Sequence, residues 1–363
     1  MIESNDYLNA QNKDFESINS FIDYLELDYK VGDSPGDFNI IASINNLPSK
    51  SEFSQNIERN FNIVFQNDDL VLFKAKVDKE IVCHYVYLDD EFPIFFTKAN
   101  KTDQIPPTIE SFLQNTADVG RLQLSRRRID QIRTELVRKY EDEIIIPFFS
   151  ARRPVDASIS AKRRSQFQRS IQYRASDGLE TYREMKFNYG VLPKIMDFEV
   201  ANQFKFRVKQ DGILVLYSGS ILELWERLQQ EVSRAKQIKD SSNTAAYGKV
   251  GSSFYPNDGM TVSSPWGIEV KSGIKEEYLE SLPTHLEEKF WEFGLSEYHP
   301  MPEIPGFTAE LIDETHYERT VLKTKGNTVR VFPRKLTDID QTVRIFNFVS
   351  DHFDSECEAQ PVL

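Results

Sequence analysis

The stretch that decides the fold is MDFEVANQFKFRVKQDGILVLYSGSILELWERLQQEVSRAK, residues 196–236. Its runs MDFEV, QFKFRVK and GILVLYS are rich in β-branched and aromatic residues, which is typical of strands. Asp211-Gly212 is a hairpin-turn signal between the last two runs. From about Ser220 onward the apolar residues recur with helical spacing, which predicts a long helix. A meander of strands that leads into a helix indicates an α+β unit.

The same order occurs twice more along the chain. In the N-terminal part, strands are expected at 62–66, 70–77, 80–88 and 92–99, before a helix at 108–116. In the C-terminal part, strands at 306–313, 317–324 and 328–334 precede a helix at 338–353. We therefore expect an α+β fold of several units, with antiparallel sheets each covered by one or more helices. The expected units are 1–120, an arginine-rich central unit at 121–238, and 260–363, with a loop or linker at 239–259.

Composition excludes several classes of protein. With 363 residues and a hydrophobic fraction of 40%, the chain can bury a substantial core. Two cysteines, Cys83 and Cys357, are too few for a secreted disulfide framework and fit a reducing cytoplasm. The first residues lack the features of a signal peptide, and no apolar run is long enough to span a membrane. Two cysteines and five scattered histidines predict no metal site, and no motif indicates a cofactor.

The charges are strongly segregated along the chain. Residues 121–174 hold 14 Lys/Arg and 6 Asp/Glu, a net charge of +8, whereas the chain as a whole has a net charge of −13. Of those 14 cations, 12 are arginine, whose planar guanidinium binds phosphate through two parallel hydrogen bonds. Phe167 and Tyr173 lie among them and can stack on bases. This segment is the best candidate for a nucleic-acid contact.

A helix is expected across the first part of the basic segment, with Ile129, Ile132 and Leu136 on its apolar face. Arg126 and Arg133 fall close to that face, so each must extend along the edge of the core or meet a carboxylate. The alternation in QFQRSIQYR, residues 166–174, favours a strand. Residues Tyr182, Met185, Phe187 and Tyr189 of a further expected helix are assigned to the core. The expected phosphate contacts are Arg126, Arg127, Arg128, Arg152, Arg153, Lys162, Arg163, Arg164 and Arg169.

Asp258, followed by Glu269-x-Lys271 on an expected strand, suggests an alternative. This order resembles the core of the PD-(D/E)xK nucleases over about 14 residues, although Asn257 stands where that family usually has proline. The resemblance implies two carboxylates that hold Mg²⁺ and a lysine that activates the attacking water.

The leading hypothesis is a non-enzymatic nucleic-acid-binding or regulatory protein of the cytoplasm that contacts DNA or RNA through the central arginines. A Mg²⁺-dependent nuclease that uses Asp258, Glu269 and Lys271 is the first alternative. The second is a scaffold protein whose arginines dock on an acidic partner or on another copy of the chain.

Overall fold

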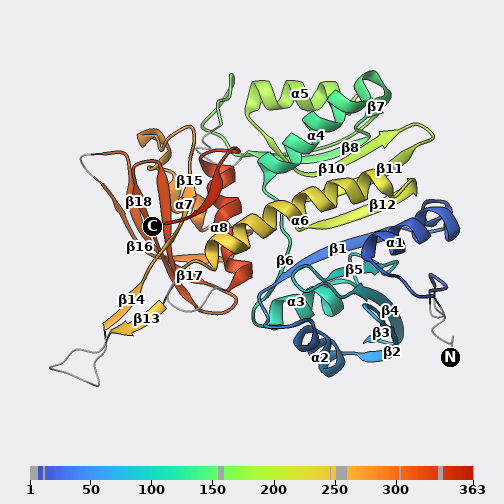
Figure 1. Ribbon diagram of the computed structural model, residues 1–363. Coiled ribbons are helices and arrows are strands. Elements are labelled where there is room, and N and C mark those ends of the chain that lie inside the picture. Colours follow the sequence, from blue (N-terminus) through green and yellow to red (C-terminus); the bar gives the residue numbers. More distant parts are fainter. Residues whose placement is uncertain are drawn as a thin grey trace. The chain divides into compact units, whose positions relative to one another are not determined.

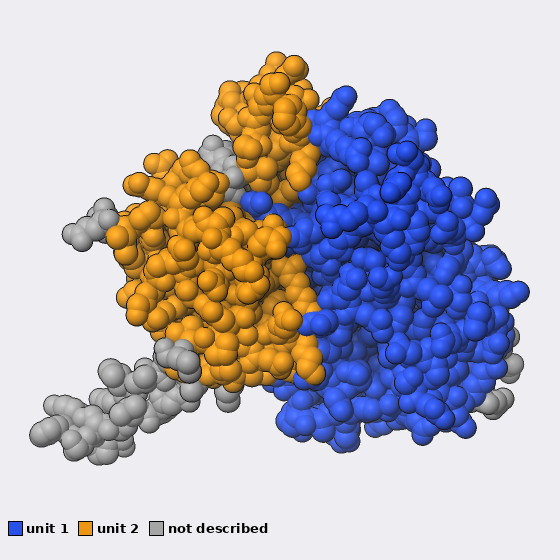
Figure 2. Space-filling model, turned by 45° about the horizontal axis from the view of Figure 1, so that its top comes forward, with its two compact units in different colours: residues 1–151, 171–184, 193–233 blue, residues 152–170, 185–192, 234–363 orange. Residues whose placement is uncertain are grey.

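The computed structural model describes residues 7–10, 13–153, 159–245, 247–250, 260–301, 304–333 and 338–362. The chain forms two compact units, distinguished by colour in Figure 2. Unit 1 comprises residues 1–151, 171–184 and 193–233, and unit 2 comprises residues 152–170, 185–192 and 234–363. The fold is α+β, as the sequence predicts, with antiparallel sheets and helices packed on them.

The strands of the larger sheet follow the order β2-β3-β4-β5-β1-β12-β11-β10-β8-β9, with β6 paired to β1 and β7 to β10 (Figure 1). They are β1 (Phe38–Asn45), β2 (Asn62–Asn67), β3 (Leu70–Val77), β4 (Glu80–Tyr87), β5 (Ile94–Thr97), β6 (Val119–Arg121), β7 (Ile144–Ile145), β8 (Phe148–Arg153), β9 (Arg169–Arg174), β10 (Leu192–Val200), β11 (Phe204–Lys209) and β12 (Ile213–Gly219). The paired strands whose register is resolved run antiparallel.

Within the described residues, six α-helices occur between or beside these strands in the sequence. They are α1 (Ile18–Asp23), α2 (Lys50–Asn60), α3 (Ser111–Asn115), α4 (Arg126–Tyr140), α5 (Gly178–Tyr189) and α6 (Leu222–Ser242). Short 3-10 or π turns occur at Tyr24–Asp28, Val31–Asp33, Pro106–Glu110 and Glu141–Glu143. Phe53 and Ile57 of α2 pack with Phe73, Phe95 and other apolar residues of the sheet, which buries one sheet face.

Unit 2 contains a sheet in the order β16-β17-β18-β19-β15-β20 and a separate hairpin, β13-β14. The elements are β13 (Tyr247–Val250), β14 (Met260–Ser263), β15 (Trp266–Glu269), a 3-10 turn at Glu276–Tyr278, α7 (Leu282–Leu286), β16 (Phe293–Pro300), β17 (Phe307–Asp313), β18 (Arg319–Lys325), β19 (Thr328–Pro333), α8 (Ile339–His352) and β20 (Glu358–Pro361). Strand β17 alternates buried and half-buried residues, as expected for a strand with one face on a core.

Helix α8 packs on this sheet (Figure 1). Nearly all of its residues are buried. Its apolar residues Ile345, Phe348 and Val349 join Trp266 and Phe307 in one hydrophobic cluster. Because α8 also carries polar side chains into the interior, those side chains must find partners there. This requirement explains the charge network described below.

The units differ from the division expected from the sequence. Strand β1, from the expected unit 1–120, pairs with β5 on one side and with β12, from the expected unit 121–238, on the other. The two expected units therefore share one sheet. The expected linker at 239–259 lies partly in α6 and partly in β13, which pairs with β14. Residues 246 and 251–259 lie outside the described part.

Candidate nucleic-acid interface

The arginines of α4 are largely engaged inside unit 1. Ser125 caps the helix, because its hydroxyl accepts the backbone N–H of Arg128 at 3.1 Å. The Arg128 guanidinium donates to Glu231 of α6 at 2.6 Å and to Glu135 at 2.8 Å. The side chains of Arg128 and Glu231 are only 13% and 5% exposed. Burial acts to lower the pKa of Arg128, but the two carboxylates outweigh it and raise that pKa above its ordinary value.

More ion pairs join the facing surfaces of α4 and α6. Lys139 donates to Glu223 at 2.7 Å, and Tyr140 donates to the same carboxylate at 2.6 Å. In the opposite direction, Arg227 of α6 donates to Glu135 of α4 at 2.9 Å. Burial, together with the hydrogen bond to Glu223, raises the pKa of Tyr140 to about 12. The basic helix is thus matched by an acidic face of α6, and much of its positive charge is compensated within unit 1.

Three other α4 arginines are buried or half-buried, whereas Arg138 is exposed. Arg126 is 6% exposed, and Arg127 is half-buried. Arg133 donates to Asp130 at 2.9 Å and lies over the ring of Tyr182, so it meets a carboxylate as its helical position predicts. Three of the nine expected phosphate contacts, Arg126, Arg127 and Arg128, are therefore placed in the packing of α4 rather than on an open face.

Arg152 and Arg153 also have partners, both in unit 2. Arg152 lies 3.9 Å from a carboxylate oxygen of Glu288. Arg153 is 2% exposed, and its guanidinium donates to the carbonyl oxygens of Ile159 at 2.6 Å and of Ser165 at 3.2 Å. A buried cation that holds two points of the same loop fixes the shape of that loop. Arg153 therefore positions the exposed residues that follow and does not itself face a ligand.

The patch that we call the basic–aromatic patch consists of five exposed residues and the half-buried Arg169. The five exposed residues are Lys162, Arg163, Arg164, Phe167 and Phe187. The backbone N–H of Arg163 donates to the Asn188 carbonyl at 2.8 Å, which ties the loop to the end of α5. The Lys162 ammonium lies 5.1 Å above the centre of the Phe187 ring. Four of the nine expected contacts, Lys162, Arg163, Arg164 and Arg169, thus come together in unit 2.

Arg169 is held differently from its neighbours in the patch. Its guanidinium stacks on the Tyr189 ring at 4.2 Å. Its Nε is buried and has no hydrogen-bond partner within the described residues. Because Nε is buried, an acceptor from outside the chain would have to bind the terminal guanidinium nitrogens.

The sequence pattern was wrong about Phe187, which is assigned to the core but is 66% exposed. Tyr182, by contrast, is fully buried, as expected. At 100° per residue, Phe187 lies about 140° round the helix from the buried Tyr182, so α5 places Phe187 outward, next to Lys162. The composition of these segments could have indicated the patch, since residues 159–170 and 185–192 hold five Lys/Arg and no Asp or Glu.

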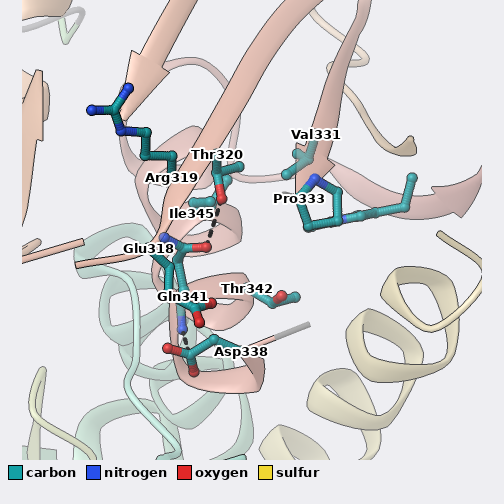
Figure 3. Close-up of a pocket in the computed structure, with 10 residues that line it drawn as sticks. Glu318, Arg319, Thr320, Val331, Pro333, Asp338, Gln341, Thr342 and Ile345 are labelled. Carbon is teal, nitrogen blue, oxygen red and sulfur yellow. Dashed lines mark hydrogen bonds between the residues drawn. The ribbon is translucent and has the colours of Figure 1, made fainter. Parts of the chain in front are cut away.

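A second group of polar residues surrounds the start of α8 in unit 2 (Figure 3). Asp338 caps the helix, because its side chain accepts the backbone N–H groups of Asp340 and Gln341. Its carboxyl group also forms a hydrogen bond with Nδ1 of His316 at 2.7 Å, and the donor depends on which of the two groups carries the proton. Beside it, Gln341 accepts from the Thr320 hydroxyl at 2.7 Å. The small hollow that they line has room for about one water-sized group. The Nε2 of Gln341 is buried without a partner in the described residues, so water is its natural acceptor.

Asp313, His316 and Asp338 offer ligand atoms within 4.8 Å of one another, a geometry that sequence spacing did not predict. Asp313, however, already accepts from two backbone N–H groups and from the fully buried Arg344, which also donates to Asp340 at 2.7 Å. Burial and Asp340 raise the pKa of Asp338. Because Arg344 would repel a metal ion, this group is best explained as the charge compensation that allows α8 to be buried.

The expected nuclease residues are only partly within the described chain. Glu269 ends β15 with an exposed side chain, and Lys271 forms an exposed ion pair with Glu358 of β20. Asp258 lies outside the described residues. Neither Glu269 nor Lys271 lines the hollow at α8.

Comparison with known proteins adds two matches. Residues 127–211 match the family model AF_0896_M, described as a family middle domain. The chain is 24% identical over 352 residues to an uncharacterized protein of Archaeoglobus fulgidus, and the alignment covers 94% of this chain and 95% of that protein. No solved structure matches the chain. Within the described residues, no helix is long and apolar enough to cross a membrane.

Proposed function

We propose that this protein is a non-enzymatic, cytoplasmic nucleic-acid-binding protein that contacts phosphates through the basic–aromatic patch. The observation that carries the proposal is that Lys162, Arg163 and Arg164 are exposed on a loop segment that contains no carboxylate. In α4, by contrast, most of the basic side chains with resolved contacts face Asp or Glu. The expected interface is accordingly narrowed from nine residues to the four cations of the patch.

The balance of charge supports selective rather than indiscriminate binding. The net charge of −13 repels a polyanion from most of the molecule, so a phosphate backbone is attracted only where cations are concentrated. The fixed backbone of the patch lowers the entropy cost of binding, because the loop is already held by Arg153 and by α5.

Fluorescence anisotropy with a labelled oligonucleotide at several salt concentrations tests this proposal. If the four patch cations each neutralise one phosphate of a single strand, affinity should fall about 50-fold between 50 and 200 mM salt. The double variant Arg163→Glu/Arg164→Glu should weaken binding at low salt and make the salt dependence about half as steep or less.

A matched control reverses two other exposed cations of unit 2, Lys323 and Lys325 of β18. Lys323→Glu/Lys325→Glu causes the same change in net charge and should leave affinity nearly unchanged. Equal losses in the two double variants would mean that net charge alone controls association. Binding that is absent in the unmodified protein, or that ignores salt, would refute the proposal.

Two further measurements distinguish the alternatives. Cleavage of DNA or RNA that requires Mg²⁺ and is lost in Lys271→Ala would identify the nuclease. An oligomer, or a complex with an acidic protein, that dissociates at high salt while no nucleic acid binds would identify the scaffold. Intact nucleic acid together with salt-sensitive binding supports the function proposed above.

A further inference from the structure

Exposed aromatic rings distinguish the patch from an ordinary cluster of surface cations. Among the phenylalanines of the described residues, only Phe167 and Phe187 are exposed, at 55% and 66%. Both belong to the basic–aromatic patch. An exposed phenylalanine costs solubility and adds nothing to the core, so two of them beside four cations suggest a ligand that has both an apolar face and negative charge.

The rings are held in place by the same contacts that fix the cations. The backbone N–H of Phe167 donates to the Arg164 carbonyl at 3.3 Å, which closes a turn between the two residues. Phe187 lies in the last turn of α5, where its carbonyl accepts from the Lys162 backbone N–H at 3.5 Å. Each ring is therefore adjacent to a cation on a constrained backbone rather than on a loose tail.

We infer that the occupant is a single-stranded nucleic acid, whose bases stack on Phe167 and Phe187 while its phosphates meet the neighbouring cations. Duplex DNA or RNA presents phosphates but keeps its bases stacked inside the helix, so it cannot use the rings. An acidic peptide offers charge but lacks a flat π surface for each residue. Only an unpaired strand matches both kinds of side chain in the patch. The inference rests on the proposed function and adds the form of nucleic acid that the patch selects.

The test compares 12-nucleotide oligo(dT) and oligo(U) with a duplex of equal phosphate number and with poly-glutamate, using the full chain. The unmodified protein should bind the single strands more tightly than the duplex or poly-glutamate. The variant Phe167→Leu/Phe187→Leu keeps apolar side chains of similar size but removes the rings. It should lose between about fivefold and 150-fold in single-strand affinity for each stacked base, and little in duplex affinity.

A fluorescent variant shows stacking directly. The three tryptophans Trp225, Trp266 and Trp291 are all buried, so a Phe187→Trp variant places a single exposed indole in the patch. Its emission should be quenched by acrylamide in the free protein, quenched by oligo(dT) or oligo(U) on binding, and unaffected by the duplex.

The outcomes separate the two proposals. Salt-sensitive binding that is equal for single strand and duplex, or that survives loss of both rings, overturns the single-strand inference and leaves the phosphate interface standing. Poly-glutamate binding as tight as oligonucleotide binding also overturns it, because the patch would then recognise charge alone. No binding of any nucleic acid overturns the proposed function itself. A preference for oligo(dT) or for oligo(U) identifies the source of the strand, and either supports the inference.

Discussion

Replacement of Gly190 by alanine tests how the patch is held in place. Gly190 has φ +62°, and an added Cβ would lie 2.1 Å from a terminal guanidinium nitrogen of Arg153 and 2.9 Å from the Ser160 carbonyl oxygen. Arg153 cannot move aside freely, because it is buried and bound to the Ile159 and Ser165 carbonyls. Gly326 is a matched control in the same unit, since it has φ +59° and nothing within 4 Å of its added Cβ.

The two variants share one cost and differ in another. Alanine in the left-handed region costs about 1–2 kcal/mol at either position. At Gly190 the clash also displaces Arg153 from two charge-assisted hydrogen bonds, each worth about 1.5–3 kcal/mol. Gly190→Ala should therefore lower the free energy of unfolding of unit 2 by about 3–6 kcal/mol more than Gly326→Ala.

Chemical denaturation followed by circular dichroism measures the loss of stability in each variant. Hydrogen–deuterium exchange locates the loss, and amides in residues 159–167 and 186–190 should exchange faster in Gly190→Ala alone. Single-strand affinity should fall with it, since the patch loses its fixed backbone. Equal destabilisation by both substitutions, with unchanged exchange at 159–167, would refute the role given to Arg153.

Three further predictions concern buried charge. Arg128→Leu should lower the free energy of unfolding, measured by urea denaturation, by about 3–5 kcal/mol because it leaves Glu231 buried and unpaired. The double variant Arg128→Leu/Glu231→Leu should be close in stability to the unmodified protein. A loss below about 1 kcal/mol in the single variant would mean that the pair is a weak surface contact. Arg344→Met should destabilise unit 2 similarly, and adding Asp313→Asn should recover part of the loss; no recovery would contradict the assigned pairing. Burial lowers the pKa of His84 from 6.5 to about 3. Below pH 6.5, His84 is therefore protonated in the unfolded chain but stays neutral in the folded chain. Stability should therefore fall by about 1.4 kcal/mol per pH unit as the pH drops from 6.5 toward 3, and a His84→Gln variant with an unchanged pH slope would contradict this.

Local structure was largely predictable from the sequence. The expected helix from about Ser220 is α6, and the expected helix at 338–353 is α8. The strands expected at 306–313 and 328–334 are β17 and β19, within one residue at each end. The strand favoured within QFQRSIQYR is β9. These predictions succeed because hydrophobic period, turn residues and caps act within a few residues of one another.

The arrangement of the sheet was less predictable. The sequence analysis places a unit boundary near residue 120. In the structure β1 lies between β5 and β12, which pairs residues about 175 positions apart, such as Phe38 with Leu216. Pairing between strands so far apart in the sequence depends on which strand edges remain unpaired after local hairpins form. A short window of sequence does not contain this information.

The sequence by itself determined that residues 121–174 form a basic island in an acidic chain, and that this island is rich in arginine. Only the tertiary structure decided which of those cations face carboxylates and which face solvent. Arg128 is neutralised by Glu231, 103 residues away, because α4 and α6 pack together, whereas Arg163 and Arg164 are carried outward on a loop beside Phe187. Charge is a property of composition, but its availability to a ligand depends on distance and desolvation, which arise only when the chain folds.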